Sequence, residues 1–210
     1  MREERFFRPQ DKKSGLQNDK KMERTRFCEL AMSYQPKVLK ILTYGHPALR
    51  VKCKPVREFN EDLRRLADDM FLTMTQSEGV GLAASQVDRT IMLLVVGVPQ
   101  PESEERIRLA AVNPVIEETR GAWDHEEGCL SIPELRDMVT RPEWIKLRYQ
   151  DLDGAPQVLE ADGMLARVLQ HEIDHLNGVL FIDHLSPVRR ALMKQKLKEL
   201  ERQNAGVCGL

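Results

Sequence analysis

The spacing of apolar residues along the chain predicts three helices. Residues 60–75, 162–177 and 187–203 each carry apolar side chains three or four positions apart, which places them on one face of a helix. Each segment also begins at or beside a residue that favours a helix N-terminus, namely Asn60, Asp162 and Ser186. For the last helix, the side chains that we expect to face inward are Leu192, Leu197 and Leu200.

Shorter apolar segments predict β-strands. Residues 144–149 alternate between apolar and polar side chains, and residues 151–154 form a turn that leads into a returning strand. Residues 91–98 are a nearly continuous apolar run, whereas residues 109–116 predict a strand that is broken at Pro114. Because strands and helices do not alternate regularly, we expect an α+β fold, with antiparallel or mixed β-sheets packed around the central helix and a C-terminal helix.

The N-terminal segment differs in composition from the rest of the chain. Residues 1–36 are dominated by charged and polar side chains without a lasting apolar period, so we expect a disordered tail. Met32 lies just upstream of the first apolar segment and is a candidate translation start. Residues 37–210 are long enough for a sizeable core, and we expect them to form a single catalytic domain.

Charge and cysteine usage exclude several classes of protein. The formal net charge of −1 provides no global basic field, which argues against sequence-specific nucleic-acid binding. No apolar run approaches the ~20 residues of a membrane-spanning helix, so we expect no membrane span. Without a secretory signal or paired cysteines, reduced thiols in the cytoplasm are favoured over a disulfide framework. The four cysteines are Cys28, Cys53, Cys129 and Cys208.

The segment Gln170-His171-Glu172-Ile173-Asp174-His175 carries the clearest chemical signal. Two histidines four residues apart on a helix share one face, so both imidazoles can bind one metal ion. Glu172 is turned about one hundred degrees from His171, where its carboxylate can reach a metal-bound water without binding the metal. The alternative is a buried helix that carries two histidines by chance.

A catalytic metal site needs a third protein ligand and one open position. Glu199 and Glu201 lie downstream, but on a charged terminal helix whose face is expected to contact solvent. One family of zinc peptidases would require a histidine at position 181, where this chain has Phe181. Cys129, which follows Gly128, is the better candidate because a thiolate is a strong ligand for a borderline-soft divalent ion.

Three stretches together resemble the ordered motifs of peptide deformylases. They are Gly79-Val80-Gly81-Leu82-Ala83-Ala84-Ser85-Gln86, Glu127-Gly128-Cys129-Leu130-Ser131 and His171-Glu172-Ile173-Asp174-His175, and the similar region spans residues 37–186. Ser85 departs from the family, which usually has proline there. The resemblance implies a metal-dependent hydrolase that removes the formyl group from the N-terminal formylmethionine of nascent polypeptides.

The resemblance also implies roles for individual residues. A divalent metal on Cys129, His171 and His175 would activate the water that attacks the formyl carbon, with Glu172 as general acid and base. Oxyanion donors would be the Gln86 side-chain amide and the Leu130 backbone N–H. The substrate would lie as an added strand beside Val80, Gly81 and Leu82.

Further expectations concern the surroundings of the site. Family resemblance favours Fe(II), and the ligand set also suits Zn(II), Ni(II) and Co(II). Val80 and Val168 are expected at the methionine pocket, and Asp174 is expected to orient a histidine. Glu127 is expected to pair with Arg141 or Arg136.

The last predicted helix also carries a basic cluster, which suggests contact with ribosomal RNA. Its basic residues are Arg189, Arg190, Lys194, Lys196, Lys198 and Arg202.

Two alternative functions would also account for a helix that carries His171 and His175. The first is a zinc metallopeptidase of the zincin type, which leaves Cys129 and Gln86 without a role. The second is a non-enzymatic ribosome-binding module with a structural metal, in which His125 or His184 would supply the fourth ligand.

Overall fold

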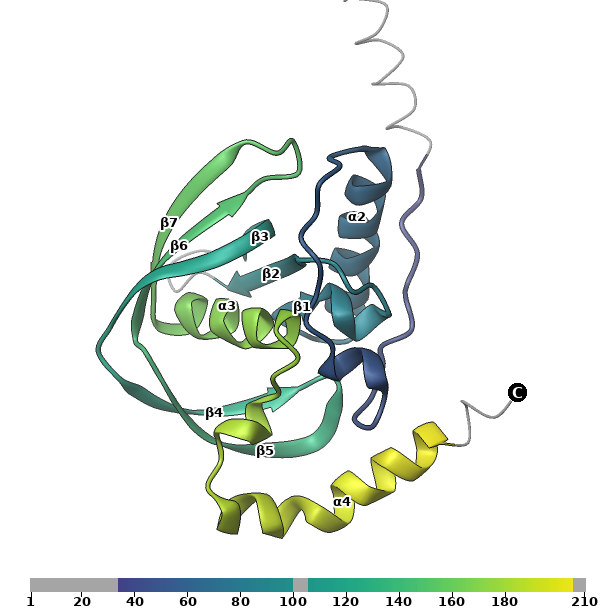
Figure 1. Ribbon diagram of the computed structural model, residues 1–210, viewed down its shortest axis with the longest axis vertical. Helices are drawn as coiled ribbons and strands as arrows, with labels where there is room; N and C mark the ends of the chain where they lie inside the picture. Colours follow the sequence, from purple (N-terminus) through teal and green to yellow (C-terminus); the bar gives the residue numbers. More distant parts are fainter. Residues whose placement is uncertain (1–33, 100–105, 206–210) are drawn as a thin grey trace, which may run out of the picture. The chain divides into compact units, whose positions relative to one another are not determined.

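The computed structural model describes residues 34–99 and 106–205 of the chain (Figure 1). The chain divides into two units at residue 35, and everything described below lies in the second. Residues 1–33 of the expected disordered tail, Met32 among them, lie outside the described residues. The helices are η1 (Pro47–Arg50), α2 (Glu61–Gln76), η2 (Ala84–Val87), α3 (Gly163–Leu176), η3 (Phe181–His184) and α4 (Pro187–Ala205).

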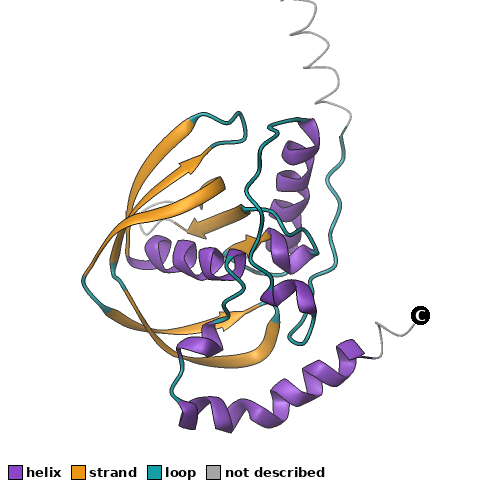
Figure 2. Cartoon of the chain, viewed as in Figure 1, coloured by secondary structure: helices purple, strands orange, loops and turns teal. Residues whose placement is uncertain are grey.

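Seven strands form two antiparallel sheets in the described part of the chain. Five of them pair in the order β1-β2-β3-β6-β7, and β4 and β5 form a separate hairpin. Figure 2 shows α3 lying between the five-stranded sheet and this hairpin. This arrangement confirms the expected α+β fold around a central helix. The strands are β1 (Gly81–Ala83), β2 (Leu93–Pro99), β3 (Arg106–Arg120), β4 (Trp123–Cys129), β5 (Ile132–Arg141), β6 (Trp144–Gln150) and β7 (Pro156–Asp162).

Helix α3 is buried on more than one side. Its apolar face packs on the large sheet, where Leu169 and Ile173 join the core formed with Leu94 and Ile145. Every residue from 166 to 173 is buried, including several polar ones. Burying a polar side chain is costly unless it is hydrogen-bonded, so the polar side chains of this helix require partners inside the protein.

Helix α2 covers the other side of the sheet and follows the predicted pattern. Asn60 caps it, since its side-chain oxygen accepts a hydrogen bond from the Leu63 N–H at 3.1 Å. Met70 and Met74 are buried in a cluster with Leu82 and Leu93 of strands β1 and β2. The prediction for residues 60–75 is therefore confirmed.

The predicted break at Pro114 is wrong, because β3 continues through it as one strand. The pairing register with β6 shifts between Val112 and Val115, which is a β-bulge. Asn113 adopts a φ of 52° there, and its side chain bonds the backbone N–H and C=O of Val56. The bulge thus accommodates a proline, which cannot donate to the ladder, without ending the strand.

The β4–β5 hairpin was not predicted from the sequence. Its strands expose many charged side chains, so no clear alternation marks them. Cys129 pairs with Ile132, and only Leu130 and Ser131 lie between the strands. The hairpin therefore places Cys129 directly before a two-residue turn.

Helix α4 buries Leu197 and Leu200 as predicted, but Met193 takes the inward place that was expected for Leu192. Leu192 is 82% exposed, whereas Met193, 7% exposed, is buried with Leu197 and Leu200. The expectation for Leu192 is wrong because the inner stripe follows positions 193, 197 and 200, and Leu192 lies about one hundred degrees away. Asn204 ties the end of the helix to the backbone carbonyls of Thr43 and Tyr44. Among the described helices, none combines the length and apolar character needed to cross a membrane.

This packing predicts different costs for two neighbouring truncations in α4. Met193→Ala should lower the free energy of unfolding by about 2 kcal/mol, because it leaves a cavity in a buried cluster. Leu192→Ala, the matched control, should change it by no more than about 0.5 kcal/mol. Urea denaturation followed by circular dichroism measures both, and equal losses would contradict the observed helix face.

Candidate metal centre

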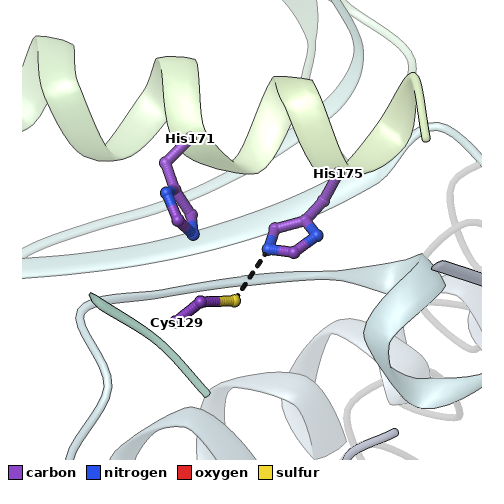
Figure 3. A group of neighbouring side chains, drawn as sticks. All are labelled: Cys129, His171 and His175. Carbon is purple, nitrogen blue, oxygen red and sulfur yellow. Dashed lines mark hydrogen bonds between the residues drawn. The ribbon is translucent and has the colours of Figure 1, made fainter. Parts of the chain in front are cut away.

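Three side chains that were expected to bind a metal lie together (Figure 3). His171 and His175 come from successive turns of α3, and Cys129 comes from the end of β4. Their ligand atoms all lie within 4.8 Å of one another. The Cys129 Sγ is 3.1 Å from the His175 Nε2. The structure thus brings the Cys129 thiol next to two imidazoles from a distant part of the sequence.

The orientation of His171 is set by Glu127. The His171 Nδ1 lies 3.0 Å from a carboxylate oxygen of Glu127, and the carboxylate can only accept this hydrogen bond. Nδ1 therefore carries a proton, so in the neutral imidazole the lone pair lies on Nε2, where a metal could bind. A carboxylate that orients a histidine in this way is the usual partner of a metal-binding imidazole.

Glu127 itself is buried and bound by two arginines. Arg141 Nε donates to it at 2.6 Å and Arg167 Nη1 at 2.5 Å. Burial alone would raise the pKa of Glu127, but the hydrogen bonds from His171 and Arg141 and the charge of Arg141 outweigh it and lower the pKa to about 2. Glu127 therefore remains a carboxylate that holds His171 at every physiological pH.

Glu127 pairs with one of its two expected arginine partners and with one further arginine, Arg167, that was not expected. Of its two candidate arginines, Arg141 makes the bond, whereas Arg136 lies on the surface 3.9 Å from Glu126. Arg167 was not predicted as a partner of Glu127, although its position within an otherwise apolar helical segment was a usable signal. Such a residue is almost never buried unless it is paired.

Asp174 contacts a histidine, but this is His184 and not one of the candidate metal ligands. Its carboxylate accepts hydrogen bonds from Arg141 at 2.8 Å and pairs with His184 Nε2 at 2.7 Å. Since Arg141 also binds Glu127, Asp174 supports the network one step further from the metal ligands. The histidine-orienting role belongs to Glu127 instead.

Glu172 follows His171 on α3, and its carboxylate lies against Gly81 of strand β1. It is 4% exposed, and its Oε2 has no hydrogen-bond partner among the described residues. Burial raises the pKa of Glu172 to about 7, against the opposing charges of His171 and Arg141. A carboxylate with a pKa near neutrality is suited to accept and return a proton.

Gly81 makes room for Glu172. A Cβ added to Gly81 would collide with the Glu172 carboxylate and lie 2.8 Å from Val168 Cγ1. The glycine that was expected beside the substrate therefore also has a packing role, since only a residue without a side chain lets β1 approach α3 here. Val80, in the same segment, is exposed.

Gln86 directs its amide nitrogen toward the cysteine. Its Oε1 accepts the Ala83 N–H at 2.8 Å, so its Nε2 is the end that lies 3.7 Å from Cys129 Sγ and 3.1 Å from Ser131 Oγ. Leu130, in the hairpin turn, is the next residue after Cys129. Two expected oxyanion donors thus belong to segments that meet at the candidate metal ligands.

The donor set fits a metal ion with an open position. Three ligand atoms converge, and Glu172, the residue after His171, is not part of the cluster and has a buried Oε2 without a described partner. A closed structural site would need His125 or His184, but neither belongs to the cluster. The described bonds of these two histidines are to the Glu126 carbonyl and to Asp174.

Comparisons with known proteins identify relatives of this chain. A family model described as polypeptide deformylase matches residues 38–191. A peptide deformylase structure from Legionella pneumophila is 40% identical, with a TM-score of 0.72 over 80% of this chain and 98% of that one. One from Thermus thermophilus is 40% identical, with a TM-score of 0.74 over 79% and 99%. A plant peptide deformylase is 35% identical, with a TM-score of 0.77 over 84% and 96%.

Glu127 should contribute strongly to stability, and Glu127→Gln tests this. The change leaves Arg141 and Arg167 buried without their anionic partner, so the metal-free protein should lose about 3 kcal/mol at pH 7. The exposed neighbour supplies the matched control: Glu126→Gln should cost no more than about 0.5 kcal/mol. Urea denaturation of both variants after chelation measures the difference.

The lowered pKa of Glu127 also predicts how the difference in stability between the parent and this variant changes with pH. The pKa of Glu127 in the folded protein, about 2, lies below the ordinary glutamate pKa of 4.5. Its ionised form therefore stabilises the fold above pH 4.5, and this contribution is lost as the pH falls toward 2. The stability gap between the parent and Glu127→Gln should shrink over that range, and a gap that widened would contradict the assignment.

Proposed function

Because this chain belongs to the peptide deformylase family, we propose that Cys129, His171 and His175 are its metal ligands and that Glu172 is its general acid and base. Peptide deformylases hydrolyse formyl-peptides, and this chain is such an enzyme. The observation that carries the ligand assignment is the convergence of one sulfur and two nitrogen atoms. The residue after His171, Glu172, has a buried carboxylate oxygen without a partner in the described residues, which supports its role in proton transfer.

The proposed reaction begins with a water molecule at this site. A bound divalent metal would lower the pKa of this water from ~15.7 toward neutrality. Glu172 accepts a proton from the water as the water oxygen attacks the formyl carbon. It then passes that proton to the amine that departs when the carbon–nitrogen bond breaks. Burial raises the pKa of Glu172 to about 7, so that this side chain can both accept the proton from water and donate it to the amine.

Two donors would stabilise the negative charge that develops on the formyl oxygen. These are the Nε2 amide of Gln86 and the backbone N–H of Leu130. Gln86 is held for this task by its own Oε1, which bonds the Ala83 N–H and so directs the amide nitrogen toward Cys129. Losing one such donor typically costs ~3 kcal/mol of transition-state stabilisation.

The substrate would bind as an extended strand beside Val80, Gly81 and Leu82. Strand β1 is at the edge of the five-stranded sheet, so one side of its backbone has no strand partner in that sheet. Backbone pairing is insensitive to side chains, which suits an enzyme that accepts many N-termini. Val80 and Val168 would then contribute to the apolar pocket for methionine.

The cellular setting is part of the same proposal. Residues 37–210 would be the catalytic domain, acting in the cytoplasm on nascent chains that begin with formylmethionine. The metal would be Fe(II), although a sulfur and two imidazoles also suit Zn(II), Ni(II) and Co(II). The zincin-type peptidase and the structural-metal module are not favoured, because neither gives Cys129, Gln86 and Glu172 a joint role.

Substitutions at the site should separate metal binding from proton transfer. Cys129→Ala, His171→Ala and His175→Ala should each lose stoichiometric metal and activity, because each removes a ligand. Glu172→Ala should keep the metal but lose at least a hundredfold in kcat, since general base catalysis is typically worth 10²–10⁴-fold. Metal analysis after anaerobic purification and a formyl-Met peptide assay provide both measurements.

Three outcomes would count against these assignments. Full metal occupancy in Cys129→Ala would remove the cysteine from the ligand set. A Glu172→Ala protein that retained more than about a hundredth of the parent rate would remove the proton-transfer role. Predominance of zinc over iron in the anaerobic preparation would contradict the proposed metal while leaving the ligands intact.

We further propose that α4 attaches the enzyme to ribosomal RNA. Some of its basic side chains already have acidic partners: Arg189 pairs with Asp137, and Lys196 lies 2.9 Å from Glu134. No ion pair is described for Lys194 or Lys198, and both line a groove of about 410 Å³ beside Tyr44. These two lysines are therefore the better candidates for phosphate contacts, which weaken as salt rises.

A charge-reversal pair tests this attachment. Lys194→Glu with Lys198→Glu should reduce co-sedimentation with ribosomes at low salt several-fold, because two phosphate contacts become repulsive. Lys40→Glu with Lys52→Glu changes the net charge equally at exposed positions outside α4 and should pellet like the parent. Equal pelleting of both double variants would remove the proposal, and activity on a short formyl peptide should be the same in all three proteins.

A further inference from the structure

Ser85 is the motif position at which this chain departs from the family resemblance, and the structure gives its hydroxyl a specific partner. The side chain is fully buried and directly precedes Gln86 in the turn η2. Its Oγ donates a hydrogen bond to the backbone carbonyl of His175 at 3.2 Å. A proline at this position would restrict φ but could not make this bond.

This hydrogen bond closes a ring of contacts around the candidate metal ligands. From the turn, Gln86 Nε2 reaches Cys129 Sγ at 3.7 Å, and Cys129 Sγ lies 3.1 Å from His175 Nε2. The backbone of His175 then returns to the turn through Ser85 Oγ. The segment that carries the amide donor is thus joined to the helix that carries a metal ligand.

Ser85 also contacts a second cysteine, Cys53, which is buried, unlike Cys129. Cys53 is 4% exposed, and its N–H donates to the Leu176 carbonyl at 2.8 Å, at the end of the same helix. Burial raises the pKa of the Cys53 thiol to about 11, although its hydrogen bond with Ser85 opposes this shift. The thiol is therefore neutral at pH 7, so it can serve as a hydrogen-bond donor toward Ser85 and is unsuited to bind a metal as a thiolate.

We propose that Ser85 is a positioning residue for Gln86. The hydroxyl of Ser85 anchors the η2 turn to the His175 carbonyl, so that the Gln86 amide stays aimed at the reacting formyl oxygen. This rests on the proposed role of Gln86 as an oxyanion donor. Transition-state hydrogen bonds depend steeply on geometry, so a turn that is free to shift would weaken the bond without removing the donor.

Ser85→Ala tests the kinetic consequence. It should lower kcat for a formyl-Met peptide about tenfold and leave KM unchanged, which is the size expected for one buried hydrogen bond. In a Gln86→Ala background the same change should alter kcat by less than about twofold, because Ser85 acts through Gln86. Thr73→Val is the matched control, since it removes a buried hydroxyl that bonds a helix carbonyl in α2, and it should leave kcat unchanged.

A second readout does not depend on activity. In the zinc-loaded, ¹⁵N-glutamine-labelled protein, the side-chain amide resonances of Gln86 are assigned by their absence from Gln86→Ala. Ser85→Ala should shift or broaden them, whereas Thr73→Val should leave them in place. Ser85→Gly serves the same purpose if Ser85→Ala does not give folded protein.

Three results would overturn the proposal. The first is a kcat for Ser85→Ala within about twofold of the parent. The second is a tenfold loss that persists in the Gln86→Ala background, which would place the effect of Ser85 elsewhere. The third is an unchanged Gln86 amide signal in Ser85→Ala. If Gln86→Ala alone keeps the parent kcat, the oxyanion role fails instead, and the amide signal still decides whether Ser85 positions Gln86.

Discussion

The buried carboxylate of Glu127 is the interaction on which the rest of the site depends. It joins the β4–β5 hairpin to α3 by accepting bonds from Arg141, Arg167 and His171 at 2.5–3.0 Å. A buried charge is tolerated only when its partners satisfy it, so the four groups form one unit. Glu127 precedes Cys129 by two residues in the same hairpin. Its bond to His171 therefore orients that histidine and also fixes the position of the Cys129 sulfur.

Enclosure of α3 explains both the packing and the chemistry of the site. The large sheet covers one side of the helix and the hairpin another, which leaves Glu172 almost without solvent. The same burial that makes the helix part of the core raises the pKa of Glu172 to about 7. This arrangement requires glycine at position 81, since any side chain there would collide with the Glu172 carboxylate.

Periodic segments were predictable because their burial is one-sided. The helix after Asn60 and the strand at residues 144–149 each bury one face, so their sequences repeat with the period of the element. Strands β4 and β5 lack such a repeat because they expose charged side chains and bury polar ones in the Glu127 network. For α4 the helix and two of its inward side chains, Leu197 and Leu200, were predictable. The third was not, since Leu192 and Met193 are both apolar and only packing distinguishes them.

The sequence by itself determined the chemical types at the site: two histidines one helical turn apart, a glutamate beside them, and a cysteine and a glutamine in two further motifs. Local spacing suffices for the histidines because the helix geometry is known in advance. Only the tertiary structure decided which atoms meet, because the contacts of Glu127 with Arg167 and of Ser85 with His175 join positions 40 and 90 residues apart. Such contacts arise from how the hairpin, the turn and the helix pack, and no local period encodes them.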